Sequence, residues 1–251
     1  MSDTETPAAK LSDLDLAALL CSRVCHDLIS PVGAIANGLE LMDDPEMDDE
    51  TKETALAMVR TSAKAAAAKL KFCRIAFGAA GSAGAVIDLG EAGDIARAFV
   101  GEEKRVQLEW NAPRENRPKQ QVKLALNMVL MALAGIPRGG LVTLTVEENR
   151  FTARAAGDRA KLPEPMVQVL DGTVELTALD ARLVQPYYAR ELARAAGLTL
   201  AMAMDGPDVV VTARISRSGQ ALPESGDLLA SPVHTRIGQR GVELRIDRVQ
   251  P

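Results

Sequence analysis

The sequence of 251 residues is poor in aromatic side chains, which make up 3% of it and include a single tryptophan. Alanine and leucine dominate instead, and this composition favours helices packed through small and aliphatic side chains over a β-sandwich. Hydrophobic residues amount to 47% of the chain, which is enough for a substantial core and excludes a wholly disordered protein. We therefore expect one large or two modest domains with a high helical content.

Cysteine and histidine are also scarce. The three cysteines are an odd number without a repeated spacing, so the sequence does not encode a disulfide framework. The two histidines, His26 and His234, lie far apart and have no cluster of Cys, Asp or Glu at the spacing of metal ligands. We expect neither a zinc centre nor any other metal site in this chain.

The chain has no excess of basic residues: 34 acidic side chains against 29 basic ones give a formal charge of −5. Surfaces that neutralise nucleic-acid phosphates need such an excess, so a nucleic-acid partner is not expected. The start of the sequence lacks the profile of a secretory signal, and the longest apolar run, residues 124–137, is shorter than the about 20 residues that cross a bilayer. The expected location is the cytoplasm, without membrane association.

Apolar residues recur every seven positions in two rows near the N-terminus. The rows are Leu14, Cys21, Leu28, Ile35 and Met42, and then Ala18, Cys25, Val32 and Leu39. This spacing predicts a long helix with a bundle-type seam, capped by Ser12 or Asp13. We expect Cys21 and Cys25 to pack in that seam as small apolar residues rather than to form a redox or metal pair.

The acidic segment around Pro45 interrupts this pattern and predicts a turn. Apolar spacing of three and four residues resumes over residues 56–77, which predicts a second helix and an antiparallel helical hairpin. Each helix of the hairpin carries an apolar stripe, and one hairpin alone cannot cover both stripes. We therefore expect two copies of the chain to form a homodimer through a four-helix bundle.

The rest of the sequence alternates between strand and helix patterns. Strands are expected at residues 86–89, 106–110, 141–147, 150–155, 198–204 and 209–215, and helices at 90–100, 118–133, 163–169 and 179–196. This order predicts an α/β sandwich with helices on one face of a mixed sheet. The expected domains are a flexible N-terminus (1–12), the helical hairpin (13–78), a linker (79–85), the α/β domain (86–217), and a tail (218–251) that is either partly disordered or left over from cloning.

His26 is the candidate for chemistry in the first helix. On a helix that turns about 100° per residue, His26 lies roughly 130° from the seam and should face solvent. The small or polar residues that share its face are Ser22, Ser30, Gly33 and Asn37. Asp27 is a candidate acceptor for the Nδ1 proton, which would leave the lone pair on Nε2 and make the ring a usable nucleophile. From helical periodicity alone, an incidental surface histidine is the more common explanation.

The second helix would face a protein docked at this histidine. With the turn near Pro45, the neighbour of His26 is expected near residue 64, in a stretch of alanines and lysines. Alanines permit close approach of another helix, and Arg60, Lys64 or Lys71 could meet acidic groups on a partner. The alternative is that the lysines only solvate the helix.

The residues HDLISPV at 26–32 resemble the phospho-acceptor box of two-component histidine kinases, in which a histidine is followed by an acidic residue and, five positions on, by proline. Pro31 in this box can bend the helix that carries the histidine. The longer segment CSRVCHDLISPVGAIANGLEL resembles the ChpT-type histidine phosphotransferases. That resemblance covers the hairpin closely and the chain as far as about Ser216 by the order of its elements.

The resemblance implies a dimeric bundle that carries a phosphohistidine at His26 in a cytoplasmic phosphorelay, with Asp27 as the second catalytic residue. The expected partners are a second copy of the chain, the receiver domain of a hybrid histidine kinase as donor, and response-regulator receiver domains as acceptors. The receivers would supply the acidic pocket and Mg²⁺, so this chain needs no cofactor of its own. The expected partner-binding residues are Ser22, Arg23, Ser30, Gly33 and Asn37 on the first helix and Arg60, Lys64 and Lys71 on the second.

The second domain resembles the ATP-binding Bergerat domain of histidine kinases but departs from its motifs. Met131-Ala132 replaces an Asn-Ala pair that would reach magnesium and phosphate, and a methionine side chain can do neither. The segments at residues 157–161 and 185–190 lack the glycines through which a backbone approaches phosphates. We therefore expect a degenerate domain that does not bind ATP and serves as a docking surface.

Two alternatives remain open from the sequence. One is the core of an ATP-dependent sensor histidine kinase with an unusual nucleotide site. The other is a dimeric scaffold that binds receivers without accepting phosphate.

Overall fold

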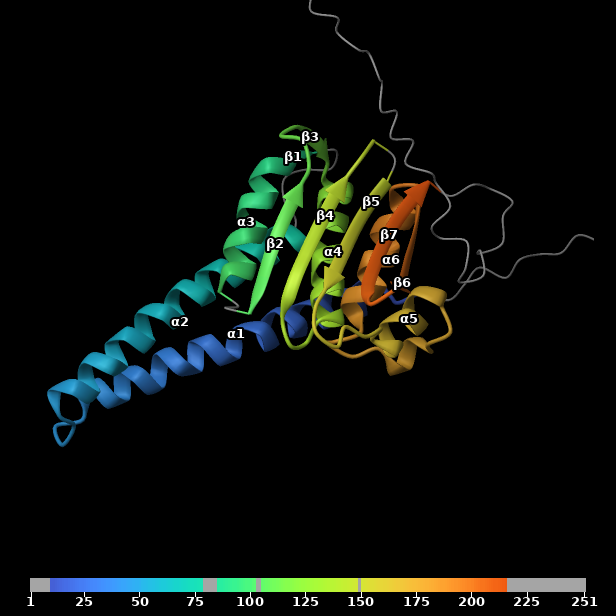
Figure 1. The fold of residues 1–251 in the computed structure, drawn as a ribbon. Helices are drawn as coiled ribbons and strands as arrows, with labels where there is room; N and C mark the ends of the chain where they lie inside the picture. Colours follow the sequence, from blue (N-terminus) through green and yellow to red (C-terminus); the bar gives the residue numbers. More distant parts are fainter. Residues whose placement is uncertain (1–9, 79–84, 103–104, 149, 216–251) are drawn as a thin grey trace, which may run out of the picture. The chain divides into compact units, whose positions relative to one another are not determined.

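The computed structural model describes residues 10–78, 85–102, 105–148 and 150–215 (Figure 1). Most of the expected flexible N-terminus, the linker up to Gly84 and the whole expected tail with His234 lie outside the described residues.

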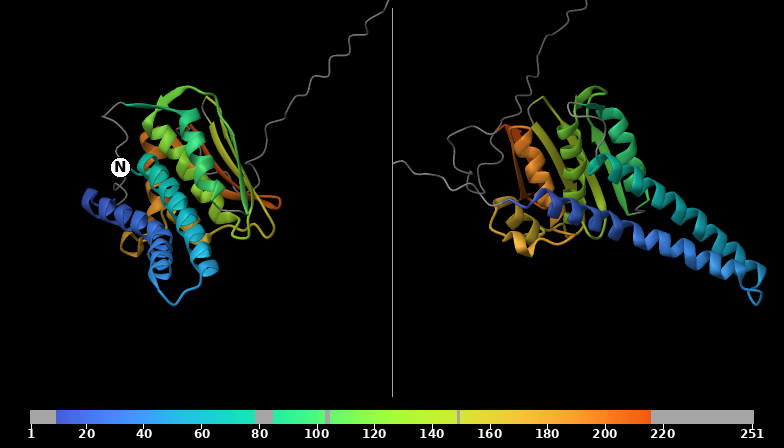
Figure 2. Two further views of the ribbon diagram at one scale, coloured as in Figure 1. Left: turned by 90° about the vertical axis from the view of Figure 1, so that its left-hand side faces the viewer. Right: turned by 180° about the vertical axis from the view of Figure 1, so that it is seen from behind.

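Two long helices form the hairpin that the sequence predicts. Helix α1 spans Asp13–Asp43 and helix α2 spans Asp49–Ala76, and they lie side by side in all views (Figure 2). Ser12, not Asp13, is the N-cap of α1, because its side chain accepts a hydrogen bond from the Asp15 backbone N–H. The two helices approach closely at Gly38, where an added Cβ would come within 2.6 Å of a Val59 methyl group.

A mixed five-stranded sheet forms the other part of the fold. Its order is β2 (Val106–Asn111), β4 (Gly140–Val146), β5 (Arg150–Ala156), β7 (Asp208–Ile215) and β6 (Leu198–Asp205). Strands β2 and β4 run parallel, and the other neighbours are antiparallel. Two further short strands, β1 (Val86–Asp88) and β3 (Asn116–Pro118), pair separately.

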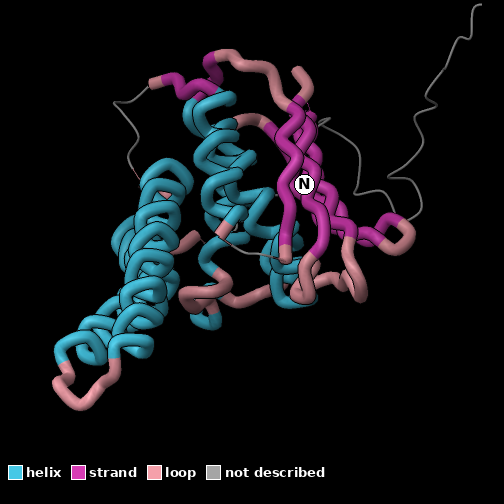
Figure 3. The backbone as a smooth tube through the Cα atoms, turned by 60° about the vertical axis from the view of Figure 1, so that its left-hand side comes forward, coloured by secondary structure: helices cyan, strands magenta, loops and turns pink. Residues whose placement is uncertain are grey.

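Helices cover one face of this sheet, as the sequence predicts (Figures 1 and 3). They are α3 (Leu89–Gly101), α4 (Lys119–Gly135) and α6 (Val184–Ala195), while α5 (Glu164–Asp171) and the short 3-10 helix η1 (Leu176–Ala178) lie between β5 and α6 in the chain. The core is contributed by alternate strand residues, such as Val142, Leu144, Phe151 and Val211, packed against a helix α4 that is buried nearly all round. The α/β sandwich is therefore confirmed.

Some details differ from the expected elements, among them the short helix η1, which was not expected. The helix expected at residues 179–196 begins only at Val184, because the Asp180 carboxylate accepts hydrogen bonds from the backbone N–H groups of Arg182 and Leu183 and fixes a turn there. Strand β3 was not expected, since it is short and polar and is defined by its pairing with the distant β1.

Helix α2 is joined to the α/β part by an aromatic contact and by a buried polar network. The ring of Phe72 stacks on that of Phe99, with centroids 4.2 Å apart. The fully buried Asn127 on α4 donates from Nδ2 to the Ala76 carbonyl of α2 at 3.2 Å, and Gln185 on α6 donates from Nε2 to Asn127 Oδ1 at 3.0 Å. The C-terminal turn of α2 is thus held by two helices of the sandwich.

A lysine lies beside this network. Lys123 Nζ donates to the Tyr188 hydroxyl at 3.1 Å and lies 3.5 Å from the Phe77 carbonyl. Burial, assisted by nearby Lys119, lowers the pKa of Lys123, and burial raises the pKa of Tyr188 to about 12. Burial thus disfavours the charge of the lysine and keeps the tyrosine a neutral hydroxyl that accepts its hydrogen bond.

Helix α1 is the one described helix that is long and apolar enough, by length and composition, to span a membrane. Helix α1 was not considered as a membrane span from the sequence, because charged residues interrupt its apolar runs. Two of those residues, Arg23 and Asp27, form an ion pair on the helix at 2.9 Å. The apolar character of α1 comes from a second stripe, which lies away from α2 and is described below.

Candidate functional site

His26 lies in the middle of α1 with 61% of its side chain exposed. Its Nδ1 is 3.3 Å from Asp27 Oδ1, and the other carboxylate oxygen, Oδ2, accepts a hydrogen bond of 2.9 Å from Arg23 Nε. Asp27 and Arg23 are far less exposed than the histidine, at 25% and 19% of their side chains. Arg23 thus contacts Asp27, and Asp27 contacts His26, whose imidazole is open to solvent.

This arrangement suits a nucleophilic imidazole. When the neutral ring carries its proton on Nδ1, it donates that proton to the Asp27 carboxylate, and the lone pair is then on Nε2. A positive charge that develops on the ring during attack is stabilised by the same carboxylate. Geometry alone therefore allows His26 to form a bond at Nε2.

The surroundings of His26 on α1 are open. The residues expected to share its face, Ser22, Ser30, Gly33 and Asn37, are all exposed. Apart from the two adjacent residues and the nearby backbone of α1 itself, no atom of the described residues lies within 4 Å of a Cβ added at Gly33. The residues on this face are thus small or polar, and the large apolar side chain next to it is that of Ile29, which is 69% exposed three residues after the histidine.

Pro31 does not end the helix, which continues to Asp43. It is buried on the side of α1 that faces α2, and it has no backbone N–H to give to the Asp27 carbonyl four residues earlier. The backbone of the turn that carries His26 and Asp27 is thus held by one helical hydrogen bond fewer than its neighbours.

The residues of α2 at the level of His26 differ from those expected. A Cβ at Gly38 would touch Ala55 and Val59, and His26 lies twelve residues before Gly38, so the matching positions on α2 are twelve residues further on, at 67–71. The expected neighbour near residue 64 is therefore wrong. The reason is that the loop runs on to Asp48, so the centre of the hairpin lies beyond Pro45.

This register changes the position of the basic residues on α2. Arg60 and Lys64 are exposed but lie nearer to the hairpin loop than His26 does. Lys69, which the sequence argument did not single out, lies at the level of His26 and acts electrostatically on Cys73, as do Arg23 and Asp27. Lys69 would have been identified from the sequence if the register of the two helices had been predicted correctly.

Cys73 is the buried group beneath this site. Burial, and secondly the charge of Asp27, raise the pKa of its thiol to about 11, against the opposing effect of Arg23 and Lys69. Cys73 therefore stays a neutral thiol and packs as a small apolar side chain. Since the charge of Asp27 acts on this buried thiol, the Asp27 carboxylate lies close to the hairpin core.

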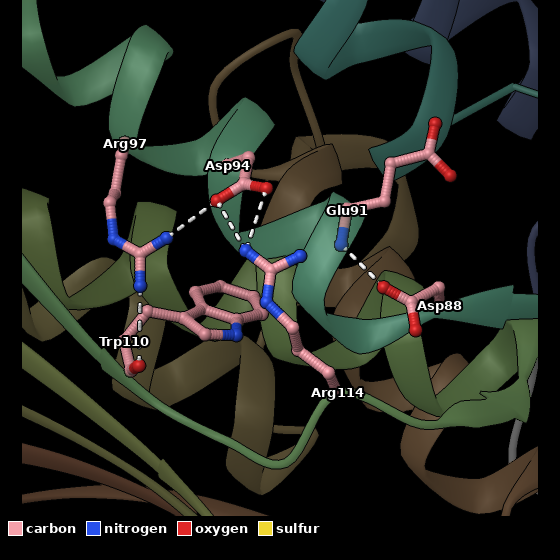
Figure 4. Close-up of polar contacts among 6 residues, drawn as sticks. All are labelled: Asp88, Glu91, Asp94, Arg97, Trp110 and Arg114. Atoms are coloured by element: carbon pink, nitrogen blue, oxygen red, sulfur yellow. Dashed lines mark hydrogen bonds and ion pairs between the residues drawn. The ribbon is translucent and has the colours of Figure 1, made fainter.

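Lys71 lines a groove of about 530 Å³ between α2 and α3. The groove wall on α2 also includes Leu70 and Arg74, and the wall on α3 includes Glu91 and Asp94. Figure 4 shows that Asp94 is already held by two arginines, Arg97 at 2.8 Å and Arg114 at 3.1 Å. The Asp94 carboxylate is therefore engaged in contacts within the chain.

An apolar stripe on α1 is uncovered in the single chain. Leu14 is 84% exposed, Val32 53% and Leu39 47%, and both Cys21 and Cys25 are exposed. The expectation that the two cysteines are packed in a seam is therefore not met within one chain. The inner face of α1 is instead formed around Pro31 and Gly38.

The residues that replace nucleotide-binding motifs do not fit a nucleotide or Mg²⁺. Met131 and Ala132 are completely buried in the core. Asp158 is exposed and lies 3.9 Å from Arg138 in an ion pair. Gln185 Nε2 donates to the backbone carbonyl of Asn127 at 3.1 Å and to its Oδ1 at 3.0 Å. Among the described residues, no group of three or more His, Cys, Asp or Glu side chains could hold a metal ion.

Comparison with known proteins adds independent findings. Residues 89–208 match the family model for the histidine phosphotransferase C-terminal domain. The protein phosphotransferase ChpT of Brucella abortus (strain 2308) is 43% identical over 207 residues, which cover 81% of this chain and 97% of that protein.

A solved structure described as a bacterial phosphotransferase is 39% identical and superposes with a TM-score of 0.75, over 83% of this chain and all of that one. The cytoplasmic segment of histidine kinase QseC is 15% identical with a TM-score of 0.35, over 53% of this chain and 78% of that one, and nothing about activity follows from that likeness.

Proposed function

Since this chain belongs to the histidine phosphotransferase family, we propose that His26 is the residue that carries its phosphoryl group. The chain is a phosphotransferase of a phosphorelay, and its partners are the kinase and response-regulator proteins of two-component signalling. The observation that carries the assignment is the contact of His26 Nδ1 with Asp27, which leaves Nε2 of a largely exposed ring free to react.

In the proposed reaction, Nε2 of His26 attacks the phosphorus of an aspartyl phosphate on the receiver domain of a hybrid histidine kinase. The N–P bond forms, the P–O bond to the aspartate breaks, and the aspartate leaves as a carboxylate. The imidazole keeps its Nδ1 proton and donates it in a hydrogen bond to Asp27, whose carboxylate balances the positive charge of the phosphorylated ring. The same steps in reverse pass the group to the aspartate of a response-regulator receiver. The receiver brings Mg²⁺, and this chain contributes a positioned nucleophile.

Neither ATP nor a metal ion belongs to this proposal as a cofactor of the chain. Met131, in the place of a magnesium-binding asparagine, is buried and has no hard oxygen ligand to offer. The α/β domain then acts as a docking surface that helps to select receivers in the cytoplasm. The burial of Met131 disfavours the alternative of an ATP-dependent kinase core.

The source of the phosphoryl group can be tested directly. The full chain is incubated either with labelled ATP and Mg²⁺ alone or with a receiver domain phosphorylated with labelled acetyl phosphate. We expect acid-labile label on the chain from the receiver only. Labelling by ATP alone would show a kinase instead, and a stable complex with the receiver that never transfers label would show a scaffold.

The uncovered stripe on α1 supports a homodimer as the acting form. Its apolar residues lie on the flank of α1 that neither α2 nor His26 occupies, and a second copy can cover them by forming a four-helix bundle. The chemistry at His26 then lies outside the dimer contact.

Val32→Asp is expected to convert the dimer to a monomer, because it places an unpaired charge in the proposed contact. Size-exclusion chromatography with light scattering measures the change. An unpaired buried charge costs at least about 3 kcal/mol, which corresponds to a loss of at least about a hundredfold in dimer affinity. Asn37→Asp, which adds the same charge on the exposed face near His26, is the matched control and should leave the dimer intact. A Val32→Asp protein that stays dimeric at micromolar concentration contradicts the proposed contact.

A further inference from the structure

We propose that Arg23 is a positioning residue of the transfer reaction, which acts through Asp27 and not through contact with a receiver. The proposal rests on the assignment of His26 as the phosphoryl acceptor. It replaces the expectation that Arg23 binds the partner.

The geometry of a helix explains why Asp27 needs such a residue. Adjacent positions on a helix point about 100° apart, so Asp27 does not face His26 by default. Arg23 precedes Asp27 by four residues and His26 by three, and it therefore lies on the turn below both of them. From there its guanidinium can hold the carboxylate in the one orientation that reaches the imidazole.

The contacts match this division of roles. Arg23 Nε donates to Oδ2 of Asp27 at 2.9 Å, and Oδ1 is left for His26 Nδ1 at 3.3 Å. Each carboxylate oxygen thus has its own partner. Without the arginine the carboxylate can turn toward solvent, and the imidazole loses the acceptor that selects the Nδ1–H tautomer.

The burial of Arg23 argues against a docking role. Its side chain is 19% exposed, whereas the basic residues Arg60 and Lys64 on α2 are exposed. Its charge also acts on the buried thiol of Cys73, which places it against the hairpin core. A guanidinium that is engaged with Asp27 and packed in this way offers little to an incoming protein.

The experiment uses a small phosphodonor, phosphoramidate, which needs no docking surface. Nε2 of His26 attacks its phosphorus, the N–P bond to His26 forms, the P–N bond of the donor breaks, and the amine leaves as ammonia after taking up a proton from water. The same variants are then assayed with a phosphorylated receiver domain. A docking residue affects only the second reaction, and a positioning residue affects both.

The variants are Arg23→Gln, which removes the charge, and Arg23→Lys, which keeps it. We expect Arg23→Gln to slow both reactions by about tenfold, as misplaced reacting groups do, and Arg23→Lys to recover part of the rate. The matched control is Arg194→Gln, since Arg194 also pairs with a carboxylate on its own helix, Glu191 at 3.2 Å, and should leave both rates unchanged. Nitrogen NMR of the His26 ring should show a smaller fraction of the Nδ1–H tautomer in Arg23→Gln.

The outcomes are distinct. A slowdown confined to the receiver reaction makes Arg23 a docking residue and overturns the proposal. An unchanged tautomer with slower rates overturns it as well, because the arginine would then act by another route. If Arg23→Gln fails to fold, Arg23→Lys provides the test. The proposal is contradicted if Arg23→Lys reacts with phosphoramidate as slowly as a His26 variant does while its His26 ring keeps the same tautomer as in the unchanged protein. By contrast, uptake of phosphoryl groups from phosphoramidate by a His26→Gln chain would refute the assignment of His26 itself.

Discussion

His26→Gln is expected to abolish phosphoryl transfer while leaving the fold intact. Glutamine has no nucleophilic nitrogen, so the N–P bond cannot form, and we expect the rate to fall by at least about a thousandfold, as in other enzymes that lose their nucleophile. The side chain is 61% exposed, and substitutions at such positions change the free energy of unfolding by less than about 0.5 kcal/mol. Acid-labile label from a phosphorylated receiver measures the first effect, and urea denaturation measures the second.

The chain provides its own control for this experiment. His234→Gln removes the other histidine of the sequence and should leave transfer unchanged. Retained labelling of the His26→Gln chain, or its loss in the His234→Gln chain, would show that the reactive imidazole had been misassigned.

Asn127→Leu is expected to lower the free energy of unfolding by about 2 kcal/mol, because it removes the side-chain partner of two buried groups. The Ala76 carbonyl at the end of α2 loses its donor, and the side-chain amide of Gln185 on α6 keeps only its hydrogen bond to the backbone carbonyl of residue 127. The loss should appear in urea denaturation followed by circular dichroism. Since the carbonyl belongs to α2, the variant should also loosen the attachment of the helical hairpin to the α/β part, which faster amide exchange in the last turns of α2 would reveal.

A double-mutant cycle separates this network from a general effect of core substitution. Gln185→Leu alone leaves Asn127 Oδ1 unpaired, whereas the double variant Asn127→Leu with Gln185→Leu removes both partners together. We expect the double variant to be clearly more stable than the sum of the two single losses implies. Additive losses would mean that the two amides do not stabilise one another.

Regular patterns allowed most of the fold to be predicted. The two heptad rows in residues 14–42 predict α1 closely, and alternation of apolar residues predicts the strands from β4 to β7. The same rows did not show which flank of α1 packs on α2 and which stays uncovered, because that depends on the close approach at Gly38 and on the burial of Pro31. A dimer contact cannot be read from one chain, and it remains a proposal.

Local contacts of the site were also accessible to sequence reasoning, and longer ones were not. Asp27 was found because it is adjacent to His26. The hydrogen bond from Arg23 to Asp27 depends on side-chain orientation, which the sequence does not give. The position of Lys69 beside the site depends on the register of the two helices, and placing the turn a few residues too early shifted that register. The buried role of Asn127 was not predicted from the sequence, because its partners come from α2 and α6.

The complete burial of Met131 has an evolutionary consequence. An asparagine restored at this position would place its amide in the apolar layer between α4 and the sheet, at a cost of about 1–3 kcal/mol and without gaining a ligand. The first step back toward ATP chemistry would therefore be penalised before any benefit could be selected. Under the proposed function, a chain with a buried thioether at this position depends on phosphoryl groups from other proteins, and the single substitution Met131→Asn would not reverse that dependence.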